Sequence, residues 1–305
     1  MDVTFFLEQI FNGLGYGFML FLLAAGLTLV FGIMDTLNLA HGSLFMVGGY
    51  VSASVHAQSG SFIAAVLVAV VVTVLLAVLL EALLVRKLYG RDHLSQVLAT
   101  FGIVLVADDV VKFIWGPSPI MAPTPALLSG PIELLGLPYP SYRLLILTAG
   151  LAVAAGLYLL VNHSKLGMLV RAGASNRAMA EFMGVRVSRV FTIVFALGAA
   201  LAALAGALMG PISAVQIGMG ESILIPALVV IVIGGIGSVR GAFVASLLVG
   251  LVDTAGRAFL PPLLREVLSP ALAADVGPAI SSIAMYMLMA GVLVFKPSGL
   301  FPARV

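Results

Sequence analysis

Long stretches without Asp, Glu, Lys or Arg alternate with short polar segments along this chain. Residues 9–34 and 36–80 carry no charged side chain, and the second stretch is long enough for two bilayer crossings with a turn near residues 58–61. A charged side chain at the bilayer centre costs about 2.5–3.5 kcal/mol or more, so such stretches predict membrane-spanning helices. Nine spans are predicted, at residues 9–34, two within 36–84, 94–114, 143–162, 190–210, 222–239, 241–258 and 278–295.

The composition of the 305 residues supports this interpretation. Hydrophobic residues make up 62% and charged residues only 9%, whereas soluble domains carry about 25% charged residues. We therefore predict an all-α, polytopic transmembrane helical bundle that forms a single domain over residues 1–305. It has eight spans instead of nine if residues 36–57 are re-entrant. The absence of cysteine excludes disulfides and thiol chemistry, and a net charge of +2 gives no reason to expect binding of nucleic acid.

Basic residues are unevenly distributed between the two sides of these spans. If the loop around residues 86–91 is cytoplasmic, eleven of the fifteen basic residues fall on that side. Because basic residues of short loops are retained in the cytoplasm, we predict an outside N-terminus and a cytoplasmic C-terminus, with residues 163–189 forming a cytoplasmic loop. The four basic residues left outside are Lys112, Arg143, Arg257 and Arg265.

The motifs of an intramembrane enzyme are missing from the sequence. It contains no H-E-x-x-H zinc motif, no G-x-S-x-G nucleophile elbow and no Walker A sequence, and its four histidines are scattered. We therefore expect a non-catalytic chain with no metal site, which receives any energy of ATP through a partner.

Carboxylates well inside the spans would indicate a proton-coupled carrier, and this chain hardly has them. Asp108 and Asp109 lie near the outer end of their span, where an ion pair with Lys112 is expected, and Asp253 is placed similarly in its own span. An ion-coupled secondary carrier is thus disfavoured, although it stays open as a rival.

A polar cluster interrupts the apolar pattern near residues 33–45. Irregular backbone at membrane depth occurs only where it is buried in protein or lines a cavity. The cluster therefore predicts a broken or re-entrant helix beside a translocation path, and the alternative is a tight cytoplasmic turn between the first two spans. The residues that we expect at the path are Asn38, His41 and Ser43.

The basic loop contains the pattern of a short amphipathic helix. Asn176 is a good N-cap, and Gly184 is a natural stop after the C-terminal turn. The small residues Ala174, Ala178 and Ala180 favour close docking on a protein over deep insertion into lipid.

Several motifs occur together in one order along nearly the whole chain. They are Gly26–Ile33, Asn38–Ser43, Arg171-Ala172 followed by Gly184-Val185, Ala205–Leu208, Gly234–Gly241 and Phe295–Phe301. With them the chain resembles the permeases of branched-chain amino acid ABC importers of the LivH type. Asn-x-Ala-His-Gly and Phe-x-Pro-x-Gly-Leu-Phe are the more specific of these motifs.

The resemblance implies an integral subunit of a bacterial inner-membrane importer. Such a subunit takes branched-chain or other apolar amino acids from a periplasmic binding protein, pairs with a homologous permease or a second copy, and is opened by two cytoplasmic ATPases. It implies no cofactor on this chain, with ATP and Mg²⁺ on the partner ATPases. The expected residues of the ATPase-coupling loop are Arg171, Ala174, Asn176, Ala178, Ala180, Glu181 and Gly184.

Three departures from the family pattern leave the substrate open. Many relatives have an acidic residue where this chain has Ser43, many have Asp near Asn176, and the tail here continues into Pro302. A change of polarity near His41 is the kind of difference that would accompany a switch to urea or short amides. An importer of urea or amides is therefore the second hypothesis.

Overall fold

The computed structural model describes residues 3–134 and 136–301, and it is an all-α helical bundle with one short hairpin. The two short 3₁₀ turns are η1 (Val85–Leu88) and η2 (Ala126–Leu128), and the hairpin pairs β1 (Pro131–Leu134) with β2 (Leu137–Pro140). The helices are α1 (Val3–Met34), α2 (Ala40–Ser59), α3 (Phe62–Leu83), α4 (His93–Trp115), α5 (Ser141–His163), α6 (Lys165–Ser175), α7 (Arg177–Phe182), α8 (Val187–Met209), α9 (Met219–Gly234), α10 (Val239–Leu264) and α11 (Pro270–Phe295).

Each of the nine predicted apolar stretches coincides with a helix. Within the described residues, six helices (α1, α3, α5, α8, α10 and α11) are long and apolar enough to cross a membrane. The other three stretches correspond to α2, α4 and α9. At 1.5 Å per residue, the 16 residues of α9 extend about 24 Å, less than the roughly 30 Å hydrocarbon core. The predicted span 222–239 was too long, because α9 ends at Gly234 and Gly235 adopts a φ of 99°.

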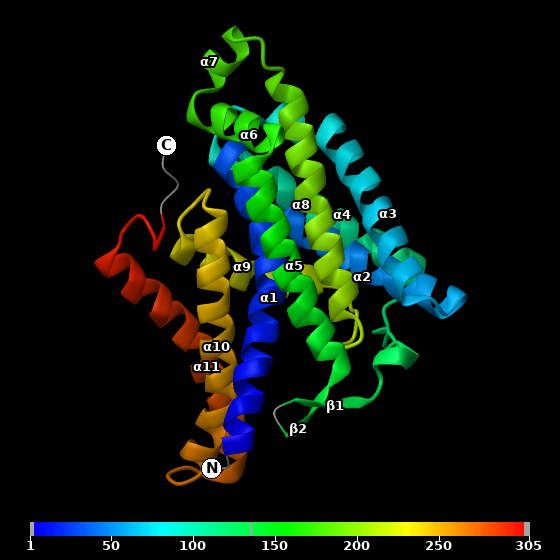
Figure 1. Cartoon of the computed structure of the whole chain (residues 1–305), viewed down its shortest axis with the longest axis vertical. Helices are drawn as coiled ribbons and strands as arrows, with labels where there is room; N and C mark the ends of the chain where they lie inside the picture. Colours follow the sequence, from blue (N-terminus) through cyan, green and yellow to red (C-terminus); the bar gives the residue numbers. More distant parts are fainter. Residues whose placement is uncertain (1–2, 135, 302–305) are drawn as a thin grey trace.

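Helix α1 lies at the centre of the bundle. In Figure 1 it runs along the long axis of the molecule, and it packs against α5, α8, α9 and α10. Every residue from Met19 to Ala25 is buried, which is the pattern of a helix surrounded by protein on all sides. By contrast, α3, α5 and α11 leave most of their apolar surface exposed, as lipid-facing helices do.

Glycines allow the central helices to approach closely, as the spacing of small residues predicts. A methyl group at Gly13 would lie 3.0 Å from the Cα of Leu251, and one at Gly17 would lie 2.9 Å from the Cα of Leu247, both in α10. In α8, a methyl group at Gly206 would overlap the carbonyl oxygen of Phe45 in α2. These glycines therefore serve helix packing.

The two ends of the bundle carry different elements. The N-terminus of α1 and the β1–β2 hairpin lie at one end, and α6 and α7 lie at the other (Figure 1). We call these the hairpin end and the α7 end. A polar break, a surface helix and a cavity lie at different depths along the bundle from one end to the other.

The acidic residues near the hairpin end are paired differently from expectation. No ion pair joins Lys112 to Asp108 or Asp109 among the described residues, so that prediction was wrong. Asp108 lies instead beside the carboxyl group of Glu221 in α9. Asp253 forms an ion pair of 2.8 Å with Arg257, one turn further along α10.

Candidate functional site

The polar cluster forms a real break between α1 and α2. Helix α1 ends at Met34, α2 begins at Ala40, and Asp35 adopts a φ of 49°, in the left-handed region that few residues other than glycine occupy. Asp35 is exposed, whereas Thr36 and Asn38 are buried. The predicted break is therefore present, and most of its polar side chains face protein.

Side chains of α4 satisfy the backbone of this break. The N–H of Leu37 donates to Oε1 of Gln96 at 3.2 Å, and the N–H of Leu39 donates to Oγ1 of Thr100 at 3.2 Å. Both acceptors are buried, so these backbone N–H groups are bonded to protein instead of to bulk water. This is how irregular backbone is accommodated inside a membrane protein. The sequence signal that could have pointed to them is a Gln and a Thr four residues apart, which are the only polar side chains within residues 96–107.

The three residues expected at the path are all buried. Their exposed fractions are 2% for Asn38, 1% for His41 and 5% for Ser43. The His41 ring fits between two glycines, since a methyl group at Gly26 would lie 3.0 Å from Nε2 and one at Gly198 would lie 3.3 Å from Cε1. Among the described residues, Asn38 Nδ2, His41 Nε2 and Ser43 Oγ find no hydrogen-bond partner. His41 therefore belongs to the packing of α1, α2 and α8, and all three side chains are enclosed by protein.

The predicted surface helix is present as α7. The side chain of Asn176 caps it by accepting the N–H of Met179 at 2.9 Å, and Gly184 follows it with a φ of 84°. Asn176 also separates α7 from α6, so Arg171 and Ala174 belong to the preceding helix. The segment 174–184 is therefore two helices joined at a cap.

The exposed face of α7 differs from the expected face of small residues. Ala178 is exposed, but Ala180 is buried against the protein, so Ala180 does not contribute to an outer surface. The large apolar residues of this segment project instead, with exposed fractions of 58% for Met179, 88% for Phe182 and 78% for Met183. The residue spacing in the sequence correctly predicted this helix but not which of its faces is exposed.

Beneath α7 lies a polar network that the sequence did not reveal. The carboxylate of Glu81 in α3 has no exposed surface, and it accepts hydrogen bonds from Arg86, Tyr89 and Thr192 at 2.7–3.1 Å. The hydrogen bond and charge of Glu81 raise the pKa of Arg86, while burial, followed by the charge of Glu81, raises the pKa of Tyr89. The ion pair between Arg86 and Glu81 is therefore embedded in a network that includes the hydroxyls of Tyr89 and Thr192.

Phe191 connects this network to α7. The rings of Tyr89 and Phe191 meet edge to face, with their centroids 5.4 Å apart. The guanidinium carbon of Arg177 in α7 lies 5.2 Å from the centroid of the same Phe191 ring, on which cation–π attraction acts. Arg177 also pairs with Glu181 at 3.2 Å on the surface. Contacts therefore run from the surface helix to α3 and α8.

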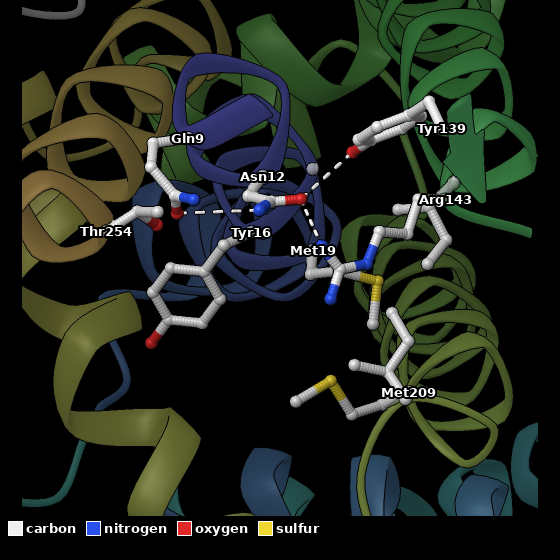
Figure 2. Close-up of a pocket in the computed structure, with 11 residues that line it drawn as sticks. Gln9, Asn12, Tyr16, Met19, Tyr139, Arg143, Met209 and Thr254 are labelled. Atoms are coloured by element: carbon white, nitrogen blue, oxygen red, sulfur yellow. Dashed lines mark hydrogen bonds between the residues drawn. The ribbon is translucent and has the colours of Figure 1, made fainter. Parts of the chain in front are cut away.

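A cavity of about 190 Å³ lies toward the hairpin end, and we call it the hairpin-end cavity. Figure 2 shows polar groups from three elements around it: Gln9 and Asn12 from α1, Arg143 from α5 and Thr254 from α10. Oδ1 of Asn12 accepts hydrogen bonds from the Tyr139 hydroxyl at 3.2 Å and from Arg143. Neither this cavity nor its neighbour, which shares Met209, is lined by Asn38, His41 or Ser43.

The side chains of the hairpin-end cavity are suited to hydrogen bonding. Among the described residues no three His, Asp or Glu side chains lie close enough together to hold a metal ion. The polar groups at the cavity are amides, hydroxyls and one guanidinium, which can hold a small polar molecule by hydrogen bonds.

Comparison with known proteins gives one consistent result. The sequence model of a family described as branched-chain amino acid transport system / permease component matches residues 9–294. The chain is 27% identical to the high-affinity branched-chain amino acid transport system permease protein LivH of Salmonella typhimurium over 285 residues, which covers 88% of this chain and 91% of LivH. It is 28% identical to the corresponding permease protein BraD of Pseudomonas aeruginosa over 313 residues, covering 98% and 96% of the two chains.

A more distant similarity extends to a sugar transporter. The ribose import permease protein RbsC of Escherichia coli is 25% identical over 261 residues, with 82% of this chain and 78% of RbsC covered. No solved structure matches the chain.

Proposed function

Because the chain belongs to the family of branched-chain amino acid transport permease components, we propose that it imports branched-chain or other apolar amino acids as the membrane-spanning subunit of an ABC importer. The observation that carries this proposal is the family match over residues 9–294, which covers the nine helices that coincide with predicted spans, except for the start of α1 and the last residue of α11. The multi-pass bundle of apolar helices provides the scaffold that such a subunit needs.

Two cytoplasmic ATPases supply the energy in this proposal. They bind ATP and Mg²⁺, and they dock on α7, where Met179, Phe182 and Met183 present apolar side chains to the outside of the chain. Exposed apolar groups of this size mark contact sites for other proteins. A periplasmic binding protein delivers the amino acid, and a second homologous permease or a second copy completes the membrane part.

The orientation in this proposal puts the α7 end in the cytoplasm and the hairpin end outside. The positive-inside distribution of Lys and Arg supports it, since the basic segment of α6 and α7 lies at the α7 end. The N-terminus is then outside and the C-terminus inside the bacterial inner membrane.

The polar break has a supporting role in the proposed mechanism. His41 lies between α1 and α8, Asn38 and Ser43 are buried beside it in the chain, and in this proposal a change in their packing shifts the helices that flank the path. Substituting Leu for Asn38 or Ser43, or Ala for His41, should therefore lower transport while leaving the binding protein's own affinity for the amino acid unchanged. Full transport by all three variants would contradict this role.

Reconstitution tests the proposed function. The chain is purified with the ATPases and binding protein encoded beside it, and uptake of leucine, isoleucine and valine into proteoliposomes is measured with and without ATP. We expect uptake that requires ATP and the binding protein. Uptake driven by an ion gradient without the ATPases would show an ion-coupled carrier, and uptake of urea, short amides or ribose in place of amino acids would move the chain to another substrate class.

A further inference from the structure

We propose that the hairpin-end cavity is a weak binding site for the amino acid in transit, in which the guanidinium of Arg143 binds the amino acid's carboxylate. The inference rests on the proposed function, since it names the groups that would recognise the imported molecule. It assigns a ligand-binding role to a residue that the sequence pattern marked only as a basic residue outside the cytoplasm.

The charge of Arg143 is available to a ligand. Among the described residues no carboxylate lies within salt-bridge distance of its guanidinium, whereas the arginines at positions 86, 177 and 257 all have acidic partners. Arg143 donates to Asn12 Oδ1, and its other donors remain. Figure 2 shows the guanidinium directed into the cavity between Asn12 and Met19. A planar guanidinium with free donors is suited to a carboxylate, which it binds through two parallel hydrogen bonds.

Asn12 holds Arg143 in this position. Its amide oxygen accepts hydrogen bonds from Arg143 and from the Tyr139 hydroxyl, and its nitrogen donates to Oε1 of Gln9 at 3.5 Å. The acceptor is neutral, so it orients the guanidinium without neutralising it. A cation fixed in this way loses little side-chain freedom when a carboxylate binds, which favours binding.

The remaining walls of the cavity match the other parts of an apolar amino acid. Met19, Ile146, Met209 and Ile212 supply an apolar surface for a branched side chain. Gln9 and Thr254 lie across the cavity from Arg143 in Figure 2, where their oxygens can accept hydrogen bonds from an ammonium group. A guanidinium at one wall and neutral acceptors at the other fit a zwitterion better than they fit a neutral sugar or urea.

The size of the cavity is sufficient for such a ligand. A water-sized group needs roughly 15 Å³ of this kind of space, so about 190 Å³ holds roughly a dozen groups. Leucine has fewer non-hydrogen atoms than that. The cavity therefore has room for one apolar amino acid.

The location of the cavity agrees with a station on the route inward. It lies toward the hairpin end, the outer end in the proposed orientation. Met209 lines both this cavity and the adjacent one, which is bounded by Phe45 of α2 and the start of α9. An amino acid released at the outer face would meet Arg143 before it reaches the centre of the bundle.

Protection of an introduced thiol tests the site directly. The chain has no cysteine, so Ile212→Cys, at a cavity wall residue that is 40% exposed, gives a single reactive position in this chain, and labelling of this subunit is followed within the full importer complex. The rate of its reaction with a maleimide is measured against the concentration of leucine or of isoamylamine, which is leucine without its carboxylate. We expect leucine to slow labelling, and isoamylamine to need a concentration about tenfold higher or more, because it lacks a charge-assisted hydrogen bond.

Variants in the Ile212→Cys background identify the cation. Arg143→Gln should raise the half-protecting leucine concentration about tenfold or more and leave that of isoamylamine unchanged. Arg265→Gln, which removes an exposed cation near the end of α10, is the matched control and should have no effect. If Arg143→Gln does not assemble, Arg143→Lys decides, because it keeps the charge but loses the planar pair of donors and should raise the concentration severalfold.

The outcomes separate the site from the function. Equal protection by leucine and isoamylamine, or unchanged protection in the assembled Arg143 variant, would overturn the site. Absence of ATP-driven leucine uptake by the wild-type complex would overturn the proposed function itself. A merely structural clamp between Arg143 and Asn12 would not make protection depend on the ligand's carboxylate.

Discussion

The hydroxyl of Tyr89 donates a hydrogen bond of 2.9 Å to Oε1 of Glu81, a carboxylate without any exposed surface. Tyr89 follows the η1 turn, and Glu81 lies in the last turn of α3. The pair joins the end of an exposed membrane helix to the loop beneath α7. Through Phe191, the same tyrosine reaches the side chain of Arg177.

The first prediction concerns the order of stability among variants of this network. Arg86→Ala leaves the buried Glu81 carboxylate without its cation, whereas Glu81→Gln keeps a hydrogen-bond acceptor for Tyr89 and lets Arg86 turn to water. We expect Glu81→Gln to lower stability by about 1 kcal/mol and Arg86→Ala to lower it further. Thermal unfolding in detergent measures both. A larger effect of Glu81→Gln would contradict this account of the pair.

The second prediction concerns ATPase docking. Phe182→Ala should weaken co-purification of the ATPases about tenfold, because exposed aromatic side chains carry much of the energy of protein interfaces. Phe113→Ala, a change at a phenylalanine of α4 that is 91% exposed, is the matched control and should leave docking unchanged.

Two bulky substitutions in α7 separate docking from folding. Ala178→Trp adds a side chain to the exposed face and should impair ATPase binding with little loss of stability. Ala180→Trp adds the same bulk at a buried position and should destabilise the chain, because overpacking a core costs roughly 1–3 kcal/mol. If Phe182→Ala and Ala178→Trp both bind ATPases normally, α7 is not the docking element.

Much of the fold follows from short-range sequence patterns. Charge-free stretches identify the membrane helices because a charged side chain is costly at any position in the hydrocarbon core of the bilayer. The boundary at Asn176 and the stop at Gly184 are also local, since a cap and a left-handed glycine act within one turn.

The candidate sites depend on contacts between distant residues, and the sequence pattern does not encode those. Arg143 meets Asn12 across 131 residues, and Gln96 meets the backbone of Leu37 across 59. Ala180 was expected on an outer face because its own helix is amphipathic, but packing against neighbouring helices of the same chain buries it. Which face of a short helix points outward is decided by the elements beneath it.

The third prediction concerns topology, which rests on the distribution of basic residues. Single cysteines at Ala126, Ser269 and Ala174 are all at exposed positions, so labelling reports the side of the membrane. In intact spheroplasts, an impermeant maleimide should react with the cysteines at 126 and 269, and with the one at 174 only after permeabilisation. Reaction at 174 in intact cells would reverse the orientation.

The fourth prediction concerns the contact between α2 and α8. Gly206→Ala should destabilise the bundle by roughly 1–3 kcal/mol, because the added methyl overlaps the carbonyl oxygen of Phe45 and backbone cannot yield as a flexible side chain does. Gly102→Ala in α4 meets no atom within 4 Å and serves as the control, with stability unchanged or slightly raised. Equal unfolding midpoints for the two variants would contradict this account, because they would show that α2 and α8 leave room for a methyl group at position 206.

The last prediction concerns the start of α4, which holds the polar break in place. The carboxylate of Asp92 caps the helix, accepting the hydroxyl of Ser95 at 2.7 Å and its N–H at 2.9 Å. These hydrogen bonds, that of the side chain foremost, lower the pKa of Asp92 below its usual value. One turn further on, Gln96 accepts the N–H of Leu37. Fraying of the first turn of α4 should therefore weaken the hydrogen bond between Gln96 and Leu37 and loosen the polar break.

A group whose pKa is lowered by folding stabilises the folded state above its unfolded pKa, about 4 for Asp, and loses that effect as the pH falls through the lower folded value. Amide exchange at Leu37 should therefore be protected in the wild type at neutral pH and lose protection in acid. Asp92→Ala should lose the protection of the Leu37 amide at every pH. Asp92→Asn keeps an uncharged cap, so its protection at Leu37 should not change as the pH falls through the range in which Asp92 titrates. Hydrogen exchange by mass spectrometry, with Asp92→Asn as the reference for intrinsic rates at each pH, measures the difference. Identical exchange at Leu37 in all three proteins would show that the cap and the break are not coupled.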